Sequence, residues 1–340
     1  QLTHIFGKLG LSSQTELALF LATLTQLMTK ERRPSDIGKH WLEASGEELS
    51  HHQIRVEGRD VAYLKYGRAG GIPVLILHST TPPQMTPEFR NACTEADLQI
   101  IAVHKPGSGG SSVRPGKHGP MELASDYLAV LHAEGLQTAF VAGHCSAGLY
   151  ALQFARSYPE CCKGLILIDT GVPFGGRREL MALPKSLRRT FLPARYIPEI
   201  LIVPHRIFAA NFRHSPAGEA RVVDYFFEGC PVDQNLTRTD RTYYEITRQI
   251  IEYSFQDVDR LVADVCRWAK DWSGLLEAVT CPIVFCHGEE NRLFESQKIL
   301  DLAKTDTRIS AVISEGNGQL QVYKDGSAFP KAIERLSAGN

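Results

Sequence analysis

The chain has 340 residues, of which 43% are hydrophobic and 22% are charged. This composition excludes a disordered chain, a fibrous protein and a small disulfide-rich scaffold. Its 37 basic residues nearly balance 38 acidic ones, so no overall positive field attracts nucleic acid or an anionic membrane. The length suggests about two domains, or one large α/β domain with an insertion.

Neither a membrane-spanning nor a secretory segment is expected. No apolar run reaches the roughly 20 residues of a membrane helix. Residues 1–6 lack the charged and apolar regions of a signal peptide. The eight cysteines form no CxxC pair, so reduced thiols in a cytoplasmic protein fit better than a disulfide framework.

The first 30 residues are expected to be helical. Ser13 and Glu16 form a capping box, in which the two side chains satisfy free amides of a new helix turn. The leucines that follow, together with Phe20, form a broad apolar face. Residues 31–50 are polar and are expected to be a linker.

Short strands are expected from residue 52 onward. His52–Val56 and Val61–Tyr66 flank Gly58 and predict a β-hairpin. Short apolar runs then alternate with helical stretches, which predicts parallel strands buried on both faces of a sheet. The runs are residues 74–77, 100–103, 139–142, 165–168, 283–286 and 309–313.

This alternation is interrupted after Asp169 by about a hundred residues of helical character that contain seven prolines. An insertion of this length after a strand predicts a helical cap over the carboxyl edge of the sheet. We place the cap at residues 172–274 and the core at 51–171 and 275–340. Residues 175–215 carry eight Lys or Arg against two Glu. A solvated helix face or an anionic ligand or partner would explain this charge.

The most informative motif is Gly143-His144-Cys145-Ser146-Ala147-Gly148, which lies between an apolar run and a helical stretch. Small residues on both sides of Cys145 are what a tight strand-to-helix turn requires when it exposes a nucleophile at a helix N-terminus. The amides of such a turn are expected to keep part of Cys145 as the thiolate.

From about residue 50 to about 335 the sequence resembles the α/β-hydrolase superfamily. The matching features occur in family order: the hairpin, Leu77-His78, Pro106–Ser111, the Cys145 turn, the cap position, His287-Gly288 and Gly316–Gly318. The resemblance implies an α/β-hydrolase fold, a mostly parallel sheet flanked by helices, with a large helical cap and an N-terminal helical extension. Gly107–Gly110 is not a phosphate loop, because no Gly-Lys-Ser/Thr follows it.

The three positions that carry the family's catalytic residues are altered. Cys145 replaces the usual serine, Asn291 stands at the acid position and Gln319 at the base position. Gln319 has no titratable nitrogen, so general-base catalysis is expected to be absent. Cys145 could attack an ester once, but the acyl group would leave slowly, which suits sensing better than turnover.

The other candidate residues are interpreted as structural. The histidines are assigned packing, loop or capping roles: His78, His144, His287 and His104. Asp169 is an alternative acid position, yet an acid without a base restores nothing. Cys161 and Cys162 are interpreted as packing residues. No cluster has metal-ligand spacing, and no cofactor is implied.

The resemblance also implies an oxyanion hole formed by backbone amides at Ser146 and around Ser79 and Thr80. Such amides need no particular side chain, so a ligand site can persist without a catalyst. Together with His78 and Cys145, they predict a site for a small acyl, ester, lactone or carboxylate compound.

Residues 2–17 resemble the end of a LuxR-type helix-turn-helix domain, with Lys8-Leu9-Gly10 followed by Ser13-x-x-Glu16. This implies a regulator that binds DNA through the full-length N-terminal domain, as a homodimer. A helical extension packed on the hydrolase-like body is the other interpretation.

The preferred hypothesis is a ligand-sensing, non-catalytic α/β-hydrolase-like domain of a cytoplasmic LuxR-type transcriptional regulator. The first alternative is an esterase, thioesterase or acyltransferase that uses Cys145 with an unrecognised base. The second is a scaffold that uses the cap for protein contacts.

Overall fold

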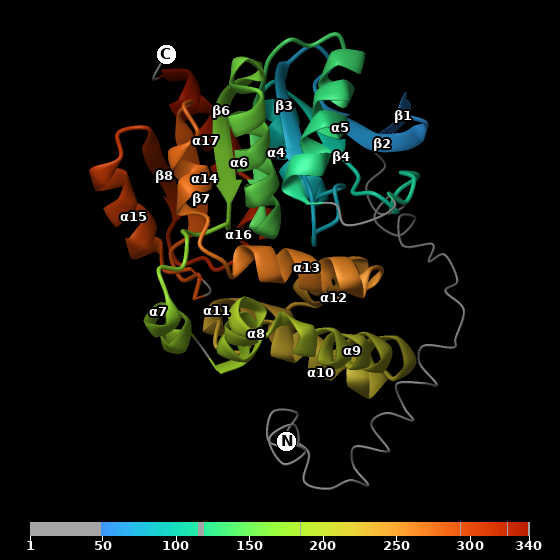
Figure 1. Ribbon diagram of the computed structural model, residues 1–340, viewed down its shortest axis with the longest axis vertical. Helices are drawn as coiled ribbons and strands as arrows, with labels where there is room; N and C mark the ends of the chain where they lie inside the picture. Colours follow the sequence, from blue (N-terminus) through green and yellow to red (C-terminus); the bar gives the residue numbers. More distant parts are fainter. Residues whose placement is uncertain (1–48, 115–118, 184, 293, 325, 339–340) are drawn as a thin grey trace, which may run out of the picture.

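The computed structural model describes residues 49–114, 119–183, 185–292, 294–324 and 326–338. The expected helix of residues 1–30, the LuxR-like segment and nearly all of the linker lie outside these residues. Helices cover both faces of one central sheet, and a second group of helices lies beyond one edge of that sheet (Figure 1).

The sheet has eight strands in the order β1-β2-β4-β3-β5-β6-β7-β8. β1 and β2 form the expected hairpin, β2 also pairs antiparallel with β4, and the remaining pairs are parallel. The strands are β1 (Ser50–Val56), β2 (Arg59–Gly67), β3 (Ile72–Leu77), β4 (Leu98–Val103), β5 (Ala139–His144), β6 (Cys162–Ile168), β7 (Ile283–Gly288) and β8 (Ile309–Ser314). The predicted fold class is confirmed.

Two hydrophobic cores lie on opposite faces of the sheet. Leu75 and Leu77 of β3 belong to the core shared with α5 and α6, whereas Val74 and Ile76 belong to the core shared with α4 and α17. Both faces are therefore buried, which explains the uninterrupted apolar runs. The helices of this part are α4 (Pro87–Glu95), α5 (Pro120–Ala133), α6 (Gly148–Ser157), α14 (Ser273–Glu277), α15 (Ser296–Thr305), α16 (Gln321–Lys324) and α17 (Ala328–Ala338).

The segment between β6 and β7 is helical despite its prolines. Pro216 and Pro231 stand in the first turns of α10 and α11, where the missing N–H costs no helix hydrogen bond. Asp240 and Asp257 cap the starts of α12 and α13. The helices are α7 (Arg177–Ala182), α8 (Lys185–Tyr196), α9 (Ile202–His214), α10 (Pro216–Phe226), α11 (Pro231–Thr239), α12 (Arg241–Phe255) and α13 (Val258–Trp268).

The carboxyl ends of the parallel strands meet at one edge of the sheet. Their register pairs Leu77 with Gly143, His144 with Ile168 and Gly288 with Ser314. The segments that follow β3, β5, β6, β7 and β8 therefore converge there. Figure 1 shows α8 to α13 beyond this edge. None of the described helices is both long and apolar enough to cross a membrane.

Candidate functional site

Cys145 stands in the tight turn that the sequence predicts. Its φ is 57°, in the left-handed region that side chains seldom occupy. A Cβ on Gly143 would lie 2.5 Å from the Ala147 carbonyl oxygen, and one on Gly148 would lie 2.3 Å from Thr170 Cγ2. Glycine is thus required at 143 because strand and helix approach so closely, and at 148 because the Thr170 side chain packs against it.

The sulfur of Cys145 accepts hydrogen bonds from two groups, the Ser146 backbone N–H and the Thr80 hydroxyl. The Ser146 amide and the Thr80 hydroxyl both favour the thiolate, while burial and the Asp169 carboxylate favour the neutral thiol. Burial is the largest effect and raises the pKa of Cys145 to about 12. The expectation of a partial thiolate is therefore wrong. Among the described residues, no imidazole hydrogen-bonds to this sulfur.

The two acid positions proposed from the sequence contact each other. Asn291 Nδ2 donates to Asp169 Oδ1 at 3.1 Å, and Asn291 Oδ1 accepts the Phe294 N–H at 3.3 Å. His287 Nδ1 lies 3.4 Å from the same Asp169 oxygen, and its Nε2 donates to the Phe294 carbonyl at 2.7 Å. Burial lowers the pKa of His287 to about 4, so its ring is neutral at pH 7. An amide and a neutral ring thus flank the Asp169 carboxylate.

The backbone at the base position is bonded to α11. The N–H groups of Gln319 and Leu320 donate to the two carboxylate oxygens of Asp233, each at 2.9 Å. A Cβ on Gly318 would lie 2.1 Å from Asp233 Oδ2. Asp233 is fully buried, and the desolvation raises its pKa although both N–H bonds oppose this. The sequence pattern did not predict this role of Asp233. The glycine at 318, which leaves room for the carboxylate, is the one local feature connected with it.

The loop after β3 is also attached to the helices beyond the sheet edge. Ser79 donates to the Asp264 carboxylate of α13, and the Thr80 carbonyl accepts from Ser254 Oγ of α12 at 2.6 Å. Asp264 also accepts from the Tyr150 hydroxyl at 2.5 Å. The side chain of Ser79 is thus engaged inside the protein.

Two histidines of this edge share one threonine. His78 Nδ1 lies 3.3 Å and His144 Nδ1 lies 3.2 Å from Thr81 Oγ1. His144 Nδ1 also lies 3.3 Å from the Tyr323 hydroxyl. Burial lowers the pKa of both histidines, that of His144 to about 4. Both rings therefore belong to a buried, uncharged network next to the turn.

A family described as alpha/beta hydrolase fold matches residues 73–325. The chain belongs to this family.

Several relatives share part of the chain. It is 32% identical over 124 residues to a poly(3-hydroxyalkanoate) depolymerase of Ectopseudomonas oleovorans, covering 36% of this chain and 43% of the relative. It is 33% identical over 123 residues to epoxide hydrolase B of Mycobacterium tuberculosis, covering 36% and 33%. A thermophilic esterase from Thermogutta terrifontis has a similar solved structure, with TM-score 0.60, 21% identity and coverage of 86% and 99%. The matched segment thus spans less than half the length of these two curated relatives.

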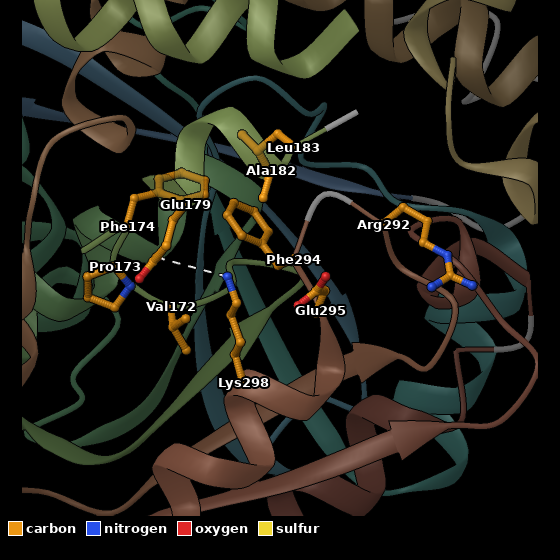
Figure 2. Close-up of a pocket in the computed structure, with 10 residues that line it drawn as sticks. All are labelled: Val172, Pro173, Phe174, Glu179, Ala182, Leu183, Arg292, Phe294, Glu295 and Lys298. Carbon is orange, nitrogen blue, oxygen red and sulfur yellow. Dashed lines mark ion pairs between the residues drawn. The ribbon is translucent and has the colours of Figure 1, made fainter. Parts of the chain in front are cut away.

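Two cavities in the described part of this α/β-hydrolase chain lie away from Cys145. The larger, of about 50 Å³, is lined by the loop after β6, by α7 and by the segment after β7 (Figure 2). Glu179 and Lys298 form an ion pair of 3.9 Å across it. Cys145 does not line it, so this cavity is not the ligand site predicted beside the sulfur.

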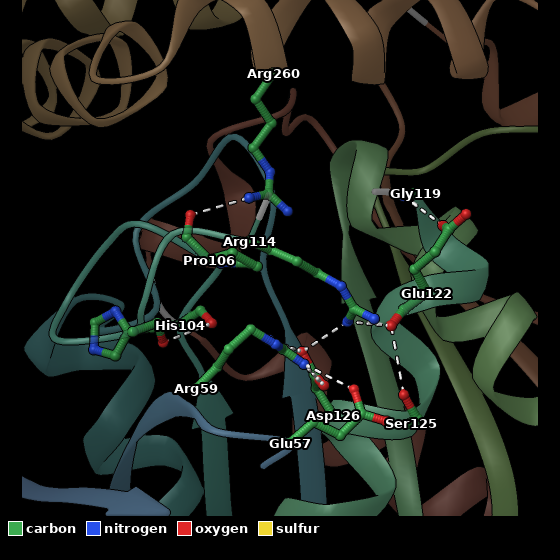
Figure 3. Close-up of polar contacts among 11 residues, drawn as sticks. Glu57, Arg59, His104, Pro106, Arg114, Gly119, Glu122, Ser125, Asp126 and Arg260 are labelled. Carbon is green, nitrogen blue, oxygen red and sulfur yellow. Dashed lines mark hydrogen bonds and ion pairs between the residues drawn. The ribbon is translucent and has the colours of Figure 1, made fainter. Parts of the chain in front are cut away.

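The smaller cavity, of about 10 Å³, lies beside the loop after β4. Arg59 and Arg114 both pair with the buried Asp126 there (Figure 3). His104 is buried against Gly109, and its ring nitrogens have no hydrogen-bond partner among the described residues. Burial lowers the pKa of His104 to about 4. The neutral His104 ring packs under the loop after β4 and is not among the groups that act on the Cys145 sulfur.

A buried lysine lies between the core and α12, and sequence analysis missed it. Lys105 Nζ lies 4.2 Å from the centre of the Tyr253 ring and donates to the Tyr253 carbonyl at 3.4 Å. Burial and the nearby Arg260 guanidinium lower the pKa of Lys105 to about 7. No group of three or more His, Cys, Asp or Glu in the described ranges is arranged to hold a metal ion.

Proposed function

We propose that this α/β-hydrolase chain binds a small molecule without turning it over, and that it senses this ligand for a LuxR-type regulator. The surroundings of the Cys145 sulfur support the proposal. The groups that hydrogen-bond to it, the Ser146 backbone N–H and the Thr80 hydroxyl, are both donors. The proposed acid and base positions hold Asn291 and Gln319, whose side-chain amides cannot accept a proton at pH 7. With a pKa of about 12, a thiol is about 10⁻⁵ ionised at pH 7.

The proposed ligand carries an acyl, ester, lactone or carboxylate oxygen. The Ser146 amide and the Thr80 hydroxyl, which contact the sulfur, are the donors that such an oxygen would take. The basic residues between 175 and 215 support a preference for anionic compounds. DNA binding through the N-terminal domain, as a cytoplasmic homodimer, is proposed on the resemblance of residues 2–17.

Isothermal titration of the full chain with small esters, lactones and carboxylates tests ligand binding. At least one class should bind, and Cys145→Ala should retain the binding because the Ser146 amide remains. Failure of all three classes to bind would overturn the sensor proposal.

A thiol esterase, thioesterase or acyltransferase is the second candidate, favoured by the names of the relatives, a depolymerase and an epoxide hydrolase. A p-nitrophenyl acetate assay separates the two. A sensor gives at most one equivalent of p-nitrophenol. Sustained turnover that Cys145→Ala abolishes, and that Cys266→Ala leaves unchanged, would instead identify an enzyme.

A further inference from the structure

Two cysteines far apart in the sequence meet at the sheet edge opposite the Cys145 turn. Cys162 begins β6 and Cys281 precedes β7, and their sulfurs lie 3.6 Å apart. The pairing of β6 with β7 holds them there, because the Leu165 N–H donates to the Pro282 carbonyl at 2.8 Å. The sulfurs are thus brought together by regular strand pairing.

The two sulfurs differ in access and in acidity. Cys162 is buried, whereas Cys281 is partly exposed. The hydrogen-bonding contact with Cys162 and the positive charge of Arg308 lower the pKa of Cys281. The pKa of Cys162 is correspondingly raised. Cys281 therefore ionises first, and it is also the sulfur that a reagent can reach.

Arg308 is fixed beside Cys281. Its guanidinium bonds to the carbonyls of Val279 and Glu277 and to the Asp306 carboxylate. Since the Ile283 N–H donates to the Arg308 carbonyl at 2.8 Å, the same residue also holds the start of β7. The positive charge that favours the Cys281 thiolate is thus held in place by backbone and side-chain hydrogen bonds.

We propose that Cys162 and Cys281 form a reversible disulfide when the protein meets a hydroperoxide. The Cys281 thiolate attacks the peroxide; an S–O bond forms, the O–O bond breaks, and the alkoxide takes up a proton as the alcohol. The Cys162 thiol then attacks the sulfenic sulfur, the S–O bond breaks and water leaves. Two thiols and one peroxide thus yield one disulfide, one alcohol and one water.

The step requires a small movement of Cys281. A disulfide needs a sulfur separation of about 2.05 Å, shorter than the 3.6 Å between the thiols. Cys281 stands in the segment before β7, where its side chain can rotate without breaking a strand pair. The bond would enclose α7 to α14 in one covalent loop, which restricts the unfolded chain and raises Tm.

The test treats the reduced full chain with hydrogen peroxide, alkylates the remaining thiols and maps the peptides by mass spectrometry. We expect a Cys162–Cys281 cross-link that dithiothreitol removes, together with a higher Tm of the oxidised protein. Cys281→Ser should lose both effects, whereas Cys266→Ser, at another partly exposed cysteine, should keep both.

Three results would overturn the proposal. These are separate alkylation of Cys162 and Cys281 after oxidation, a Cys161–Cys162 bond in place of the cross-link, and accumulation of sulfinic acid at Cys281. Cys162 is buried, so Cys162→Ser can impair folding. Cys281 is partly exposed, so Cys281→Ser can remove the disulfide without that complication. The outcome is independent of ligand binding at the Cys145 turn.

Discussion

The Asp233 carboxylate holds Gln319 by its backbone, with 2.9 Å between Gln319 N and Asp233 Oδ2. Its other oxygen accepts the Leu320 N–H at the same distance. Asp233 belongs to α11, and Gln319 follows β8. One carboxylate therefore joins the helices beyond the sheet edge to the loop that occupies the base position.

Removal of this carboxylate should destabilise the protein. Asp233→Ala leaves two backbone N–H groups without their acceptor, and we expect the free energy of unfolding to fall by about 2–3 kcal/mol. Urea denaturation measures the change. Asp259→Ala, which removes an exposed ion pair with Arg206, is the control and should change it by less than about 1 kcal/mol. Equal losses in the two variants would contradict this role of Asp233.

The close approach at the Cys145 turn predicts a second loss of stability. In Gly143→Ala the new methyl group would meet the Ala147 carbonyl at 2.5 Å, and backbone atoms cannot rotate away. We expect a destabilisation of about 3 kcal/mol, measured by thermal or urea unfolding. Gly274→Ala is the matched control, because a Cβ at Gly274 in α14 meets nothing within 4 Å. Its stability should be unchanged or slightly higher.

The sheet and the Cys145 turn could be predicted because local sequence determines them. Strands buried on both faces need continuous apolar runs such as 165–168, and these strands were found as predicted. The turn needs Gly143 because a Cβ there would meet Ala147, a near neighbour in the chain, whereas the need for Gly148 comes from Thr170, which follows β6. The pattern of small and apolar residues therefore carried this part of the fold.

Contacts between distant segments could not be predicted from such patterns. Asp233 lies 86 residues from Gln319, Asp264 lies 185 from Ser79, and Cys281 lies 119 from Cys162. The ionisation of Cys145 was mispredicted for a related reason. The helix amides that favour a thiolate are local, whereas the burial that outweighs them depends on packing between segments distant in the chain.

The buried Lys105 predicts a rise in stability with pH. Its folded pKa of about 7 lies below the ordinary value of 10.5, so the unfolded chain binds more protons between these two values. Stability should therefore increase as the pH rises from about 7, by at most about 1.4 kcal/mol per unit. Urea unfolding at pH 6, 7, 8 and 9 measures this. The difference between wild type and Lys105→Met isolates the contribution, and a flat difference would contradict it.

The high pKa of Cys145 predicts slow alkylation. Iodoacetamide reacts with the thiolate, so its rate at Cys145 should rise about tenfold per pH unit from pH 7 to 10. Peptide mapping after timed quenching follows each cysteine separately. Cys281, whose pKa is lowered, is the internal comparison and should react faster at pH 7. A rate at Cys145 that levels off below pH 9 would mean that the thiol is already fully ionised there, which would contradict its raised pKa.

A base placed at position 319 should convert binding into turnover. Gln319→His introduces a titratable ring at the proposed base position, and a positioned general base contributes about 10²–10⁴-fold to a rate. We expect p-nitrophenyl acetate hydrolysis to rise at least about tenfold, with a further gain when Asn291→Asp is added to orient the ring.

Gln319→Asn, which keeps an amide, is the matched control and should show no gain. Cys145→Ala in the Gln319→His background should abolish the new activity, because the base acts on that sulfur. An increase that survives Cys145→Ala, or that Gln319→Asn reproduces, would show that the missing proton acceptor is not what limits this site.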